Sequence, residues 1–94
     1  MKQAVGIMEL YGRIVKGHKT IYQKNVCDAC APQAGFRDRL EDCLLALCRD
    51  ADIPVPIWLS KNSSELSRFG KTGFYAEQFT EPVTFDRFEI KIIK

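Results

Sequence analysis

The amino-terminal third of the chain alternates apolar and polar residues with the two-residue period of a β-strand. Over residues 8–15, MELYGRIV, alternate positions can face a core while Glu9, Tyr11 and Arg13 face outward. KGH at residues 16–18 supplies a turn, and KTIYQKNV follows with the β-branched and aromatic residues that strands favour. The sequence therefore predicts a β-hairpin over residues 8–26, against which the rest of the chain must pack.

Two helices and two further strands are predicted after the hairpin. Apolar side chains recur at spacings of three and four over residues 36–50, which indicates an amphipathic helix. NSSE at residues 62–65 is a capping-box variant that begins a short helix, and Gly70 closes it. We expect a buried strand over residues 55–59, where prolines force an extended entry, and a terminal strand where VTFDRFEIKIIK alternates.

The expected element order is β-β-α-β-α-β. This order is typical of an α+β fold with a sheet of about four strands, a β-hairpin at the amino terminus and two helices packed on one face. A chain of 94 residues can build one hydrophobic core, so we expect a single domain over residues 1–94. The other face of such a sheet is left to solvent or to a second copy of the chain.

The block from PIWLSKNSSELSRF through EQFTEPVTFDRFEIKI carries a resemblance. Together with the hairpin and the first helix, it resembles small bacterial single-domain proteins of the same layout, to which no activity is assigned. The resemblance covers most of the chain and implies the single-domain architecture. It transfers no catalytic or binding residue.

Charge and hydropathy narrow the classes of partner. The chain has 14 basic and 12 acidic side chains and a formal charge of +2, so its electrostatics give little support to a phosphate-rich partner. Its longest apolar run is too short for a bilayer span or a signal peptide. We therefore expect a cytoplasmic protein with no membrane partner.

Four cysteines raise the question of metal or redox chemistry. Cys27 and Cys30 have the C-x-x-C spacing of a zinc knuckle, and a dithiol ahead of a helix can also supply a thiolate for disulfide exchange. Cys43 and Cys48 are five residues apart on the predicted helix, which separates their side chains by about 140°. Cys43 falls on the apolar face and is expected in the core, which leaves Cys48 as a further candidate ligand. A metal-binding or thiol-redox protein that uses Cys27 and Cys30, with zinc as the possible cofactor, is one alternative.

Basic and aromatic residues concentrate on the hairpin. Tyr11 offers a stacking surface, and Arg13, Lys16 and Lys19 offer phosphate contacts, so an RNA or single-stranded DNA module is a second alternative. The same residues also suit the wet face of an ordinary sheet, where lysines protect an edge from aggregation. Nucleic acid is therefore not the expected partner.

Aromatic residues crowd the carboxy-terminal third. Phe74, Tyr75 and Phe79 fall in a predicted loop, where large aromatic side chains act as anchors of protein contacts. The one histidine, His18, lies on the hairpin turn, and no nucleophile and base can be assembled around it. We therefore expect a non-enzymatic protein-interaction or self-association domain, a homo-oligomer or the ligand of a partner protein, with no catalytic residue and with its interface at these three aromatic residues.

Overall fold

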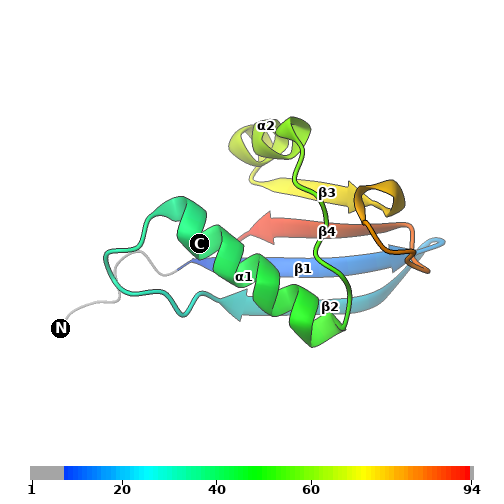
Figure 1. The fold of residues 1–94 in the computed structure, drawn as a ribbon, viewed down its shortest axis with the longest axis horizontal. Coiled ribbons are helices and arrows are strands. Elements are labelled where there is room, and N and C mark those ends of the chain that lie inside the picture. The colour runs from blue at the N-terminus through cyan, green and yellow to red at the C-terminus, as the bar shows by residue number, and fades with distance from the viewer. Residues whose placement is uncertain (1–7, 94) are drawn as a thin grey trace.

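A computed structural model describes residues 8–93 of the chain. In chain order the elements are β1 (Glu9–Lys16), β2 (Lys19–Cys27), α1 (Phe36–Ala51), α2 (Ser60–Phe69), β3 (Lys71–Tyr75), the 3-10 turn η1 (Ala76–Gln78) and β4 (Arg87–Ile92). The sheet is antiparallel throughout and has the order β2-β1-β4-β3. The first and last strands of the chain are thus neighbours at its centre (Figure 1).

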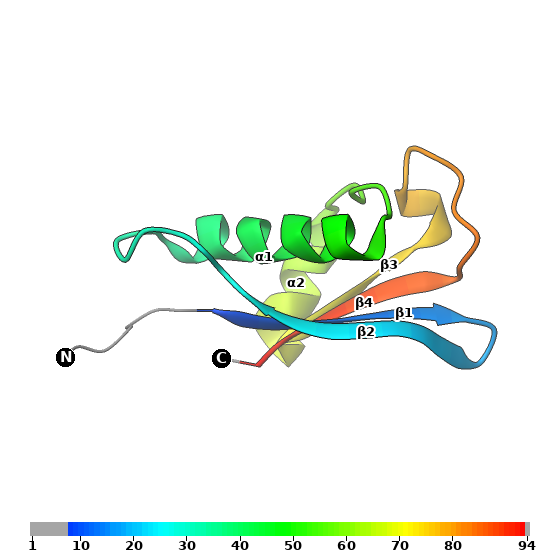
Figure 2. The same cartoon turned by 90° about the horizontal axis from the view of Figure 1, so that it is seen from below.

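The predicted α+β class is confirmed, with a 4-stranded sheet, an amino-terminal hairpin and two helices. α1 lies across one face of the sheet, and α2 lies beside the β3 edge with Leu66 in the same core (Figures 1 and 2). Within residues 8–93 no helix lies over the opposite face of the sheet, which we call the open face (Figure 2). None of the helices described is both long and apolar enough to cross a membrane.

The position of the third strand was predicted wrongly. Residues 55–59 form no strand but an extended connection between the two helices, and the third strand is β3, in the predicted loop. The order is therefore β-β-α-α-β-β. Prolines at positions 54 and 56 cannot donate to a ladder, and Ile57 instead exchanges hydrogen bonds with Gln78, whose carbonyl accepts its N–H at 2.7 Å.

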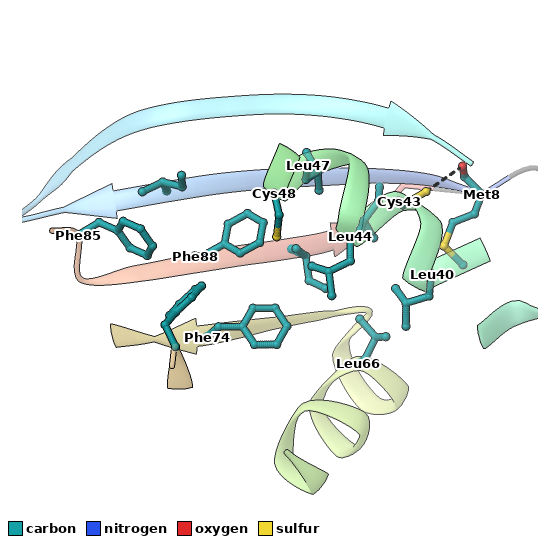
Figure 3. Close-up of a cluster of buried hydrophobic side chains, with 14 residues drawn as sticks. Met8, Leu40, Cys43, Leu44, Leu47, Cys48, Leu66, Phe74, Phe85 and Phe88 are labelled. Carbon is teal, nitrogen blue, oxygen red and sulfur yellow. Dashed lines mark hydrogen bonds between the residues drawn. The ribbon is translucent and has the colours of Figure 1, made fainter. Parts of the chain in front are cut away.

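The core fills the space between α1 and the sheet. Figure 3 shows side chains of α1 pointing toward Phe74 and Phe88, both fully buried. Leu47 of α1 packs directly on Gly12 of β1, where an added Cβ would lie 2.7 Å from Cδ1 of Leu47. With α1 packed this tightly on one face, every second residue of the central strands is left to the open face.

Candidate functional site

The strand register sets one row of side chains on the open face. Tyr11 of β1 pairs with Lys91 of β4, and Lys91 pairs with Lys71 of β3. Phe69, at the end of α2 beyond the β3 edge, lines the same hollow as these three residues. Across the sheet from β1 through β4 and β3 to α2, the two lysines thus lie between two aromatic side chains. We call Tyr11, Lys91, Lys71 and Phe69 the lysine row.

The two lysines of this row have no acidic partner within 4.0 Å among the described residues. Like charges directly opposite each other on neighbouring strands destabilise a sheet. The opposed lysines, Lys71 and Lys91, therefore repel each other and lower the stability of the free protein.

The neighbouring row is an ion-pair network. Arg13 pairs with Glu89 across the strands and donates to its carboxylate from Nε at 3.0 Å, while Arg87 donates to the other carboxylate oxygen. Burial raises the pKa of Glu89, but the hydrogen bonds from the two guanidinium groups outweigh it and leave this pKa below its usual value. Glu89 is thus held as a carboxylate between two cations, which leaves a positive surplus here as well.

A shallow hollow of about 490 Å³ lies over these two rows. Gly73 lines it opposite Glu89, and a Cβ added to Gly73 would meet no atom closer than 3.7 Å. Packing therefore does not require glycine at this position, and the missing side chain keeps the hollow open. Glycine inside a strand often marks a place where a ligand approaches the backbone.

Buried polar contacts fix α2 beside this hollow. Asn62, predicted as the cap of α2, lies within its first turn and is fully buried. Its amide nitrogen donates to Oγ1 of Thr72 at 2.8 Å and to the carbonyl of Gly73 at 3.0 Å, and its oxygen accepts the N–H of Leu59. These bonds join α2 to β3, so they fix the helix that carries Phe69 relative to Lys71 and Lys91.

Tyr75 is the exposed member of the predicted aromatic interface. It borders the hollow, and Nζ of Lys61 lies 4.7 Å from its ring centroid in a cation–π contact. Phe74 and Phe79 are buried in the core, so neither side chain is available to a partner in this structure. Phe74 is buried because residues 71–75 form a strand and not a loop, so that successive side chains alternate between core and open face. Phe79 follows η1 and packs edge-on against Phe85, with 5.3 Å between the ring centroids.

The predicted nucleic-acid residues separate into two places. Tyr11 and Arg13 lie on the open face, whereas Lys16 and Lys19 pair with each other at the hairpin turn. Sequence reasoning missed Lys71 because β3 was not predicted. The alternation of β4 did put Arg87, Glu89 and Lys91 on one face, but it did not indicate which strands lie on either side of β4.

The connection that follows Cys27, the last residue of β2, and contains Cys30 is organised by a buried ion pair. Nη1 of Arg39 donates to the carboxylate of Asp28 at 2.8 Å, and both side chains are almost fully buried. The backbone N–H of Met8, that of Cys30 and the Arg39 guanidinium lower the pKa of Asp28 against the opposing effect of burial. Arg39 also donates to the carbonyls of Ala31, Pro32 and Ala34.

The thiols are not arranged around a common point. Cys27 is exposed, Cys30 is half-buried, and Cys48 lies in the core. Over residues 8–93 no group of three or more His, Cys, Asp or Glu side chains is placed to hold a metal ion. The metal hypothesis thus gains no support from this placement.

Burial makes three of the thiols poor nucleophiles. It raises the pKa of Cys43 to about 12 and that of Cys48 to about 11. The pKa of Cys30 is raised by burial and by the carboxylates of Asp42 and Asp28. Because the thiolate is the reactive form, these shifts oppose a role in disulfide exchange.

A second concavity, of about 730 Å³, lies between the two helices and the connection that joins them. Apolar side chains line most of it, among them Leu40, Trp58 and Leu66. Its two charged lining residues, Arg37 and Glu41, balance each other. The lining of this groove therefore has no net charge that would favour a charged partner, in contrast to the open face.

Comparison with known proteins adds no relative to these observations: no protein-family model, no curated protein and no solved structure matches the chain.

Proposed function

We propose that this protein is a small non-enzymatic binding domain that holds an anionic partner on the open face of its sheet. The observation that carries the proposal is the pair of opposed lysines, Lys71 and Lys91, without an acidic partner within 4.0 Å in the described structure. An anion between them would remove their repulsion and would accept charge-assisted hydrogen bonds from both ammonium groups. The energetic cost in the free protein would then be recovered on binding.

An anionic partner fits this face better than a second copy of the chain does. Burial of Phe74 and Phe79 leaves the self-association hypothesis with Tyr75 alone of its three anchors. The cores of protein interfaces are depleted in lysine, and a two-fold contact through this face would bring equal cationic surfaces together. Charge thus favours a partner with the opposite sign.

Binding, and not turnover, is proposed because the groups on this face hold ligands more readily than they move protons or electrons. Lysine and arginine donate to oxygen atoms, and the aromatic rings offer flat apolar surfaces. The carboxylate beside them, Glu89, is engaged by Arg13 and Arg87. Its lowered pKa makes it a weak general base.

The test is salt-dependent retention on heparin, a polyanion, with a matched pair of double variants. The variant Lys71→Gln with Lys91→Gln removes the opposed pair on the open face. The control, Lys16→Gln with Lys19→Gln, removes an opposed pair at the hairpin turn and changes the net charge equally. We expect the first variant to elute at lower salt and to reduce the slope of log K against log salt by about 1 to 2, with a smaller effect for the control.

Equal losses in the two variants would overturn the proposal, because binding would then follow net charge and not the open face. Unchanged elution of the Lys71 and Lys91 variant would overturn it as well. Far-UV circular dichroism of each variant checks that the fold is retained.

A further inference from the structure

We infer that the anionic partner is a single-stranded nucleic acid. This inference rests on the proposed function, because it names the ligand of the same face. The observation behind it is that the unpartnered lysines have as neighbours the half-buried ring of Tyr11 and the exposed ring of Phe69. A single-stranded nucleic acid needs both kinds of side chain, because cations bind its phosphates and aromatic rings stack on its bases.

The aromatic rings around the hollow leave surface open to a ligand, and Nζ of Lys61 lies over one side of the Tyr75 ring. Phe69 is 64% exposed and Tyr75 is 47% exposed. Tyr11 is half-buried, and its hydroxyl donates to Oε1 of Gln23 at 2.7 Å, which holds the ring in place. Bases stack on such rings without regard to sequence, because every base has a π-face.

The spacing of the rings suits a chain of several nucleotides better than a single small ligand. Tyr11 and Tyr75 lie on strands two apart in the sheet, and the register separates them by four residues along β4, from Lys91 to Arg87. Ordinary sheet dimensions make this about 10 Å across the strands and about 13 Å along them. The backbone of a strand that stacks a base at each ring would cross Lys91, Glu89 and Arg87 of β4, where the carboxylate of Glu89 is already engaged by Arg13 and Arg87.

The position of the rings around the hollow favours a single strand over a duplex. The hollow is lined by Gly73 at the sheet and by Glu65 and Phe69 of α2 at one side. In a duplex the bases are paired and stacked inside, so their faces cannot reach rings that lie on a sheet. Unpaired bases can turn outward and stack on them.

An acidic peptide would satisfy the same lysines but would leave the rings unused. Its carboxylates would accept from Lys71 and Lys91 as phosphates do. It offers no flat π-surface to Phe69 or Tyr75. A nucleic acid would use the aromatic side chains and an acidic peptide would not. The experiment therefore substitutes these side chains.

The experiment measures the fluorescence anisotropy of labelled oligo(U) and oligo(dT) of about ten nucleotides, a length within the site sizes of single-strand-binding folds. A duplex and a poly-glutamate peptide of matched length are measured beside them. The variants are Phe69→Leu and Tyr75→Leu, and the control is Phe36→Leu, a phenylalanine 57% exposed on the helix side. All three positions are exposed, so the variants retain the core.

We expect the single strands to bind, and each of the two open-face variants to weaken binding by about fivefold or more. The control should bind like the unmodified protein. Poly-glutamate binding without oligonucleotide binding, duplex binding as tight as that of the single strand, or oligonucleotide binding unaffected by both open-face variants would overturn the inference and leave the proposed function standing. If neither oligonucleotide, peptide nor heparin binds, both fail.

Discussion

At the scale of single residues, the buried carboxylate of Asp28 stabilises the fold. Asp28 accepts hydrogen bonds from two backbone N–H groups and from Arg39, which holds the strand β2, the cysteine-containing connection and α1 together. The lowered pKa of Asp28 means that its carboxylate stabilises the folded state at any pH above its ordinary value of about 3.9. That stabilisation is lost as the pH falls below this value and through the lower pKa of the folded state.

The change Asp28→Asn should therefore lower the thermal midpoint at pH 7, by about 5 °C or more, because it leaves a buried guanidinium without its counter-ion. The difference from the unmodified protein should shrink as the pH is lowered below about 4, because Asp28 of the unfolded chain then becomes protonated, and that of the folded protein follows at lower pH. Thermal unfolding at several pH values measures both effects. The exposed Glu81→Gln serves as a control. A difference that stays constant with pH would contradict the assignment.

The four thiols should differ in reactivity toward an aromatic disulfide reagent at pH 8. Cys27 is exposed and should react first, whereas Cys43 and Cys48, with pKa values raised by burial to about 12 and about 11, should react only on unfolding. The raised pKa of Cys30 should slow its reaction relative to Cys27. Cys27→Ser should remove the fast phase. Four equal rates in the folded protein would be incompatible with this packing.

At the scale of elements, two glycines in strands have opposite roles. Gly12 lies under α1, where a methyl group would press into Leu47, while Gly73 lies over an open hollow. Gly12→Ala should therefore destabilise the fold by about 1–3 kcal/mol through overpacking. Gly73→Ala should leave stability unchanged or slightly increased, because alanine loses less chain entropy on folding. Chemical denaturation of the two variants measures the contrast, and equal losses would contradict it.

The same elements explain how far sequence alone could go. The hairpin and α1 follow from local periodicity, so the pattern predicts them. β3 does not, because KTG reads as a loop and its partner β4 begins more than ten residues later in the chain, at Arg87. Half of the site was therefore predictable: Tyr11 and Arg13 share a face by alternation. The opposition of Lys71 and Lys91 exists only once β4 lies between β1 and β3.

At the scale of the whole molecule, stability and binding should compete on the open face. α1 covers one side of the sheet (Figure 2). The other side carries the opposed lysines, Lys91 on a central strand and Lys71 on an edge strand. Most surface substitutions change stability little, so a gain of stability on removal of one particular lysine identifies a position that is unfavourable in the free protein. A substitution that raises stability and weakens binding therefore identifies a residue whose role is to bind the ligand.

The single change Lys91→Gln should thus raise the free energy of unfolding by about 0.2–1 kcal/mol and weaken retention on heparin. The gain should be larger at low salt, because salt screens the repulsion between exposed charges. Lys24→Gln is the matched control: Nζ of Lys24 donates to Asp50 at 2.9 Å, so its removal should lower stability and not raise it. Denaturant unfolding of both variants at two salt concentrations measures the opposite signs. A loss of stability in Lys91→Gln would mean that the lysine stabilises the free sheet, and the argument from repulsion would fall with it.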